Sequence, residues 1–290
     1  MRFHDIHILE SLTGGFSRRT GTRLHEMIEP LALAYSRQVD VHHRWIATQQ
    51  ELFDRLAAIA TDVRDRARVP ILHLETHGSP RGLQLASGEF VTWDHLRPAL
   101  TDINIGARLN LFVMVAACDG LDLLTILRPT HRATARIIIG PNRTLTDGEV
   151  ERANLAFYTT LFEMSDGIAA YNAMNDAIEA PSETRKELFT TMSAEVMFYS
   201  VMRGYFRKYG SEAQIAARVE GLIAPLALLG LAPHELAKRR SLGRAELGRH
   251  RAHFQEYLER FFFFDLQPEN RERFNITFEQ CWTGESMPHA

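Results

Sequence analysis

The sequence predicts an α/β fold with a mainly parallel sheet, followed by an α-helical C-terminal region. Up to about Ala180, short apolar runs alternate with longer amphipathic segments, which is the pattern of successive βαβ units. Beyond Pro181, apolar residues recur at helical spacing instead. We therefore expect an α/β domain at residues 1–180 and an α-helical region at residues 181–290.

Five apolar runs are predicted to form the strands of the sheet, at residues 3–10, 39–46, 71–76, 111–117 and 136–140. The fourth run has almost no polar residue, which indicates a central strand that is covered on both faces. Between the third and fourth strands, Gly88 supplies the turn of a small hairpin over residues 83–91.

Helices are predicted where apolar residues recur at helical spacing or where a capping box marks the first turn. In a capping box, the N-cap side chain and an acid or amide three residues later bond each other's backbone N–H groups. Such boxes predict helix starts at Thr48, Thr146 and Ser211. Spacing predicts further helices over residues 24–35, through Leu96 and Leu100, from Leu188 to about Gly210, around 257–264 and around 274–282. The four consecutive phenylalanines at 261–264 are expected to pack in a core.

Composition and charge exclude several classes of protein. The 290 residues have the apolar and charged fractions of an ordinary globular protein, which excludes a disordered or fibrous chain. A net charge of −3 gives no overall attraction for nucleic acid or for an anionic membrane. The basic run from Lys238 to Arg251 is expected to be a solvated helix face, with RNA or an acidic protein as the alternative partner.

The cysteines and the N-terminal residues predict a cytoplasmic protein. Cys118 and Cys281 are too few for a disulfide framework. Charged residues begin at Arg2, unlike in a signal peptide, and no apolar run approaches the ~20 residues needed to cross a bilayer. We expect neither export nor a membrane span.

Two residues at the ends of predicted strands are candidates for catalysis. His77 ends the third strand and Cys118 ends the fourth, and each lies beside a glycine or close to one. Parallel strands joined by a crossover end at the same edge of the sheet, where active sites form. We therefore expect these two side chains to meet there.

A thiol beside an imidazole predicts nucleophilic catalysis. His77 would take the proton of Cys118, and the thiolate would attack a carbonyl carbon. The backbone N–H groups of Gly78 and Cys118 are expected to stabilise the oxyanion, an effect on the order of 10²–10³ in rate per donor. Considered singly, such a cysteine is more often a small buried hydrophobe and such a histidine a surface residue. Their joint placement favours acyl transfer, most simply peptide hydrolysis.

At this point the sequence resembles the caspase-like cysteine peptidases, and among them the bacterial CHAT type. The resemblance rests on a strand followed by His77-Gly78 and a strand running through Ala116-Ala117-Cys118-Asp119-Gly120. It covers residues 3–180 and includes the run Ala135–Gly140 and the later Ala156-Phe157-Tyr158. It implies an αβα sandwich in which His77 is the general base and Cys118 the nucleophile.

The resemblance leaves the cleavage preference open. Caspases have a glutamine two places before the nucleophile and metacaspases an acid, and both help to form the substrate pocket. Ala116 stands at that position here and can do neither. Arg19, after the first strand, resembles the caspase arginine that binds a substrate aspartate, although a solvated charge is the alternative.

Other motifs predict neither a metal nor a cofactor. His73-Leu74-Glu75 resembles half of a zinc-deaminase signature, but the later Cys pair is missing. His42 and His43 are expected on opposite faces of one strand, which makes them a poor metal pair. No phosphate-binding glycine loop or serine nucleophile motif is present.

The sequence therefore predicts a cysteine endopeptidase that acts on a protein substrate through a Cys–His dyad. Proteins of the type it resembles commonly act in bacterial defence or regulated cell death, and a partner, processing or a ligand activates them. We expect the helical region to recruit substrate or to bind an activating protein or ligand. The alternatives are a catalytically inactive adaptor and acyl transfer to an acceptor other than water.

Overall fold

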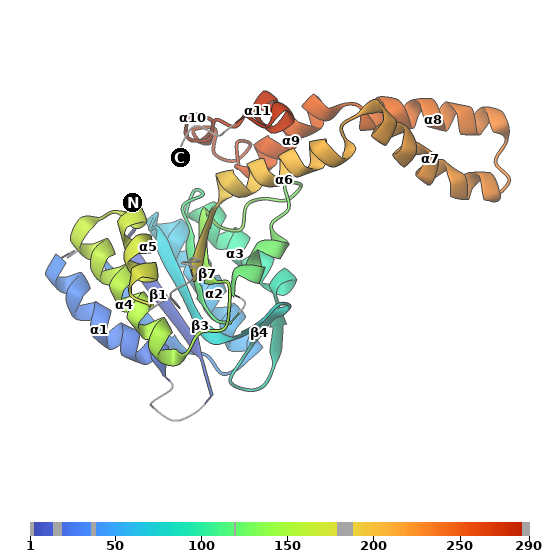
Figure 1. Ribbon diagram of the computed structural model, residues 1–290. Coiled ribbons are helices and arrows are strands. Elements are labelled where there is room, and N and C mark those ends of the chain that lie inside the picture. Colours follow the sequence, from blue (N-terminus) through green and yellow to red (C-terminus); the bar gives the residue numbers. More distant parts are fainter. Residues whose placement is uncertain (1–2, 14–18, 36–38, 119, 179–187, 286–290) are drawn as a thin grey trace. The chain divides into compact units, whose positions relative to one another are not determined.

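A computed structural model describes residues 3–13, 19–35, 39–118, 120–178 and 188–285 (Figure 1). The chain divides into two compact units. The first unit comprises Met1–Leu127 and Ala133–Ala194, and the second comprises Arg128–Arg132 and Glu195–Ala290. Pro181, near which the sequence predicts the domain boundary, lies outside the described residues.

The first unit is built on a mainly parallel sheet with the strand order β2-β1-β3-β6-β7-β8. Neighbouring strands run parallel, except that β8 pairs antiparallel with β7. These strands are β1 (Asp5–Ser11), β2 (Asp40–Trp45), β3 (Pro70–Ser79), β6 (Phe112–Ala116), β7 (Ile137–Pro141) and β8 (Phe189–Ser193). A hairpin of β4 (Gly82–Gln84) and β5 (Phe90–Thr92) extends from the end of β3, as the sequence predicts.

Helices cover both faces of the sheet, as Figure 1 shows. One face packs against α1 (Thr20–Tyr35), α4 (Asp147–Met164) and α5 (Gly167–Asp176). The other face packs against α2 (Gln49–Arg66) and α3 (Trp93–Gly106), with a 3-10 helix η2 (Gly120–Ile126) following β6. The capping boxes predicted at Thr48 and Thr146 are present at the starts of α2 and α4. These layers confirm the predicted α/β fold class, an αβα sandwich.

Alternation along β3 determines which side chains face which layer. Ile71 packs in the core under α1 and α4, whereas Leu72 and Leu74 pack in the core under α2 and α3. Because successive strand residues point to opposite faces, the odd-numbered residues from Ile71 to His77 face the α1–α4 layer. In the register of β3 with β6, Glu75 lies beside Ala116.

Two segments differ from the sequence prediction. Residues 189–193, predicted as the first turn of a helix, form β8 and cover the edge of β7, and α6 (Ala194–Tyr209) begins after them. Two β-branched threonines, Thr190 and Thr191, suit a strand, and pairing with an open sheet edge outweighs the helical spacing. Strand β3 continues past Thr76 to Ser79 because its last three residues pair with β4.

The second unit is helical in its described residues. After α6 come α7 (Glu212–Leu228), α8 (Pro233–Leu247), α9 (His250–Phe261), α10 (Asn270–Arg273) and α11 (Phe278–Thr283). The four consecutive phenylalanines 261–264 are buried, which confirms the predicted core packing. Phe262 stacks on Phe274 with ring centroids 4.7 Å apart. Cys281 is fully buried, and burial raises the pKa of its thiol to about 12.

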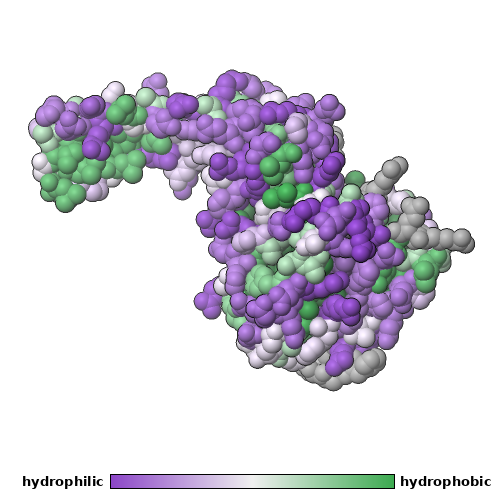
Figure 2. All heavy atoms as spheres, turned by 180° about the vertical axis from the view of Figure 1, so that it is seen from behind, coloured by the Kyte–Doolittle hydropathy of each residue, from purple (hydrophilic) through white to green (hydrophobic). Residues whose placement is uncertain are grey.

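The pair of helices α7 and α8 has a small core and an apolar surface. Their shared core contains only four buried side chains, Ile215, Val219, Ile223 and Leu236. Leucines are exposed on the same two helices and their connection, at positions 222, 228, 229 and 242. Figure 2 shows an apolar patch on α7 and α8. Among the described residues, no helix is both long enough and apolar enough to cross a membrane.

Candidate active site

His77 lies in the part of β3 that extends beyond the parallel sheet. It pairs with Gln84 of β4, and the next residue, Gly78, pairs with Leu83. The His77 side chain is exposed, and its ring has no hydrogen-bond or ion-pair partner among the residues that the structure describes. The hairpin therefore holds the backbone of His77, while its imidazole is exposed.

Cys118 lies two residues after the end of β6, on the strand next to β3. Cys118 is partly exposed, and its thiol forms no disulfide. The backbones of Gly78 and Cys118 touch: a Cβ atom added to Gly78 would lie 2.0 Å from the carbonyl oxygen of Cys118 and 2.9 Å from Cβ of Ala117. Only glycine permits this approach. The contact brings together the two chain segments that carry the predicted dyad.

His77 also lines a cavity of about 480 Å³. The cavity is bounded by the residues that follow β1 and by the first turn of α4. Its lining residues are Leu12, Thr13, His77, Thr146, Asp147 and Gly148. A larger cavity of about 610 Å³ lies elsewhere on the first unit and includes the first residues of β6 and β7, Phe112 and Ile137, but none of the predicted site residues.

The two predicted substrate-binding residues have different surroundings. Arg19 is exposed and directly precedes Thr20, the first residue of α1. Ala116 is buried, with 6% of its surface exposed, and is the last residue of β6. Arg19 can therefore reach solvent, whereas Ala116 presents little surface to a substrate.

Two buried carboxylates fasten the start of α1 to the sheet. Glu10 of β1 and Glu75 of β3 are register neighbours, and at most 1% of each is exposed. Glu10 accepts hydrogen bonds from the backbone N–H groups of Gly21 and Thr22, at 3.1 and 3.0 Å. Glu75 accepts one from the hydroxyl of Thr20 at 2.7 Å. The backbone just after Arg19 is therefore fixed near the carboxyl ends of β1 and β3.

The same carboxylates have further donors deeper in the fold. Glu75 also accepts from Nδ2 of Asn154 at 2.9 Å and lies 2.9 Å from Nε2 of His73. Nδ1 of His73 lies 2.9 Å from the hydroxyl of Tyr158, whose pKa is raised by burial and by the nearby charge of Glu75. Burial alone would raise the pKa of Glu10, but hydrogen bonds from His43, Thr22 and Gly21 outweigh it and lower the pKa.

Neither this network nor the lining residue Asp147 is predicted from the sequence. A signal for the network was present, because Glu10 follows Ile8 and Leu9, and Glu75 follows Leu74, in strands predicted to be buried, where an acid is costly unless it is hydrogen-bonded. No comparable signal marked Asp147, since an acid in the first turn of a helix is ordinary.

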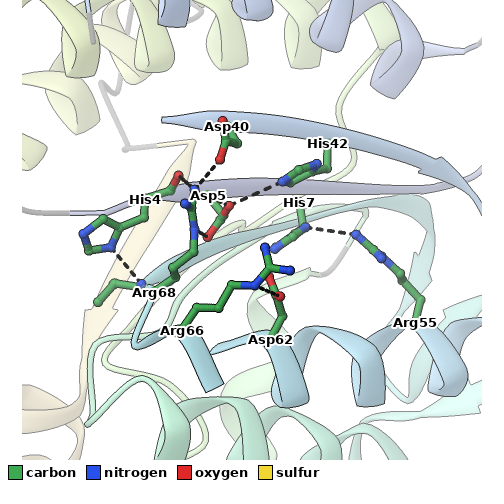
Figure 3. A network of polar contacts seen from close by, with 10 residues as sticks. His4, Asp5, His7, Asp40, His42, Arg55, Asp62, Arg66 and Arg68 are labelled. Atoms are coloured by element: carbon green, nitrogen blue, oxygen red, sulfur yellow. Dashed lines mark hydrogen bonds and ion pairs between the residues drawn. The ribbon is translucent and has the colours of Figure 1, made fainter. Parts of the chain in front are cut away.

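One group of side chains has ligand atoms close enough for a metal ion. Atoms of Asp5, His7 and His42 lie within 4.8 Å of one another, away from the carboxyl ends of the strands (Figure 3). Arg68 donates two hydrogen bonds to Asp5, at 2.6 and 2.7 Å, and Arg55 donates one to Nδ1 of His7 at 3.3 Å. A cation would have to displace both guanidinium groups, so the geometry favours a salt-bridge network over a metal centre.

Two solved structures are similar to this chain over part of its length. The chain matches no protein-family model and no curated protein. Among solved structures, caspase-1 from Spodoptera frugiperda is 13% identical with a TM-score of 0.47, over 66% of this chain and 86% of that one. A secreted C11 cysteine protease from Bacteroides thetaiotaomicron, in complex with an irreversible peptide inhibitor, is 10% identical with a TM-score of 0.49, over 70% of each chain.

Proposed function

We propose that this chain is a cysteine endopeptidase in which Cys118 is the nucleophile and His77 the general base. The observation that carries the proposal is the backbone contact between Gly78 and Cys118, which joins the ends of two neighbouring strands. These ends carry the imidazole of His77, which has no partner among the described residues, and the partly exposed free thiol of Cys118. Both residues lie at the carboxyl edge of a parallel sheet, where ligands bind in open α/β folds.

In the proposed reaction, His77 accepts the thiol proton of Cys118 as the sulfur attacks the carbonyl carbon of a peptide bond. The C–N bond then breaks, and the amine leaves with the proton that His77 held. Water attacks the resulting thioester, His77 takes one of its protons, and the acid product is released as the proton returns to the thiolate. Both steps balance without a cofactor or metal.

The negative charge that develops on the carbonyl oxygen needs hydrogen-bond donors. We assign this role to the backbone N–H groups of Gly78 and Cys118. The backbone contact between Gly78 and Cys118 supports the assignment, because it brings these two residues together at one edge of the sheet.

The resemblance to CHAT-type peptidases suggests where this peptidase acts and on which substrates. We propose that the peptidase acts in the cytoplasm on specific protein partners, in bacterial defence or regulated cell death, and that Arg19 contacts the substrate. The C-terminal helices would recruit the substrate or bind an activating protein or ligand.

The test uses an irreversible peptide electrophile and the two cysteines of the chain. Cys118 is expected to be modified faster than Cys281, whose thiol is fully buried and has a raised pKa. Cys118→Ala and His77→Ala are expected to abolish cleavage of the cognate protein, while circular dichroism shows an unchanged fold. Retained cleavage in either variant would refute the dyad.

The second candidate function is that of a catalytically inactive adaptor that binds a protein partner. The exposed leucines of α7 and α8 favour it, because burying such a side chain on a partner contributes about 1.5–3 kcal/mol. Slow modification of both cysteines at equal rates would favour the adaptor. Faster modification of Cys118 favours the peptidase, and product analysis shows whether water or another acceptor receives the acyl group.

A further inference from the structure

We propose that the cavity beside His77 binds a basic side chain of the substrate, with Asp147 as the residue that selects it. The inference rests on the proposed peptidase function and names the class of substrate. The juxtaposition that carries it is a carboxylate and the predicted general base lining one cavity of about 480 Å³.

The charge in this cavity follows from the ion pairs of α4. Three carboxylates lie in its first two turns, at Asp147, Glu149 and Glu151. Glu149 accepts a hydrogen bond from Arg143 at 2.7 Å, which lowers its pKa to about 2, and Glu151 forms an ion pair with Arg23. Asp147 is exposed and has no hydrogen-bond or ion-pair partner among the residues that the structure describes. Of the three carboxylates, the one that lines the cavity is thus the one whose charge no described residue pairs with.

The remaining lining residues suit a long cationic side chain. Thr13 and Leu12 also line the cavity; a threonine hydroxyl can accept a further N–H, and a leucine offers apolar surface to a methylene stem. A guanidinium group binds a carboxylate through two parallel hydrogen bonds, and it has donors left for a hydroxyl. The cavity is within the size range of small-ligand sites.

The position of the cavity relates it to the reaction. Strand β3 lies between β1 and β6 in the sheet, so His77 has Cys118 on one side and Thr13, which follows β1, on the other. A substrate whose carbonyl meets Cys118 therefore has a side chain close to the scissile bond that can enter the cavity. Arg19, the residue that the caspase resemblance assigns to an acidic substrate, does not line the cavity.

The test compares three irreversible peptide probes that differ in one residue beside the reactive ketone: arginine, citrulline or aspartate. Citrulline has the shape of arginine but no charge, so the comparison isolates the charge. The rate of covalent modification of Cys118 is measured by intact mass. The arginine probe is expected to react about tenfold faster than the citrulline probe. This ratio corresponds to the lower limit of the free energy that a hydrogen bond to a charged group contributes.

Variants assign the preference to Asp147. Asp147→Asn is expected to remove the difference between arginine and citrulline, Asp147→Glu to retain it, and Asp147→Lys to favour the aspartate probe. Asp65→Asn is the matched control, because Asp65 is an exposed carboxylate of α2 with no partner among the described residues. This control is expected to react like the wild type with all three probes.

The outcomes separate the two levels of the proposal. Equal rates with arginine and citrulline, or a preference for aspartate in the wild-type chain, would overturn the specificity and leave the peptidase in place. An arginine preference that persists in Asp147→Asn would overturn the role of Asp147. Failure of every probe to modify Cys118 faster than Cys281 would instead refute the proposed function.

Discussion

The closest backbone approach at the candidate site gives a direct mutational prediction, Gly78→Ala. The added methyl carbon would lie 2.0 Å from the carbonyl oxygen of Cys118, whereas real Cβ contacts essentially never fall under 3.0 Å. The end of β3 and the turn at Cys118 must therefore separate by about 1 Å or more. Both clashing groups, the carbonyl oxygen of Cys118 and Cβ of Ala117, are on or next to backbone, so a rotamer change gives no relief.

The size of the effect follows from this displacement. A misplacement of about 1 Å costs on the order of 10² in catalytic rate, because the attacking atom leaves its productive position. Overpacking of this kind lowers the free energy of unfolding by about 1–3 kcal/mol. The β3–β4 hairpin remains paired on its other side, so we expect a folded protein with a strongly impaired site.

The assay is the rate at which a peptide electrophile modifies Cys118, with stability measured in parallel by urea unfolding. Gly204→Ala is the matched control, because a Cβ atom at this exposed glycine of α6 meets nothing within 4 Å. The control is expected to react at the wild-type rate and to be more stable by about 0.5–1 kcal/mol. A Gly78→Ala variant that reacts at the wild-type rate would refute the contact and the site built on it.

Two further predictions concern buried ionisable groups. Burial, together with the charges of His42 and Arg55, lowers the pKa of His7 from 6.5 to about 3. The unfolded chain therefore binds the additional proton below pH 6.5, and about 2 kcal/mol of the free energy of unfolding is lost between pH 6.5 and pH 5. Urea unfolding at both pH values should show a smaller loss in His7→Gln; an equal loss would contradict the burial of a neutral imidazole. Glu75→Gln leaves one of the three donors to Glu75 without an acceptor, so it should lower the free energy of unfolding by about 1–3 kcal/mol, and unchanged stability would argue against the network.

Much of the sandwich was predictable because its elements carry local signals. The central strands β3 and β6 begin with or consist of apolar residues, and the capping boxes at Thr48, Thr146 and Ser211 mark helix starts that depend on neighbouring residues alone. Strand β8 was not predictable in this way. Its sequence suits a strand and a helix alike, and the choice depends on an open edge of β7 about 50 residues earlier in the chain.

Part of the candidate site can likewise be predicted from the sequence, and part of it appears only in the folded chain. Positions at the ends of strands can be inferred from the order of elements, so the sequence alone indicates His77 and Cys118 as candidates. The close approach of Gly78 to Cys118 depends on the extension of β3 into the hairpin, and this pairing appears only in three dimensions. Asp147 lines the cavity because α4 begins opposite the end of β1, although the two segments lie far apart in the sequence.

The central claim is that the imidazole of His77 activates the thiol of Cys118. Its most direct test is the rate at which iodoacetamide, a reagent that needs no substrate pocket, alkylates Cys118 at pH 7 in the wild-type chain and in His77→Ala. The account predicts that the wild type reacts roughly tenfold faster, because a free thiol is only a few per cent thiolate at this pH. Equal rates in two folded proteins would contradict it.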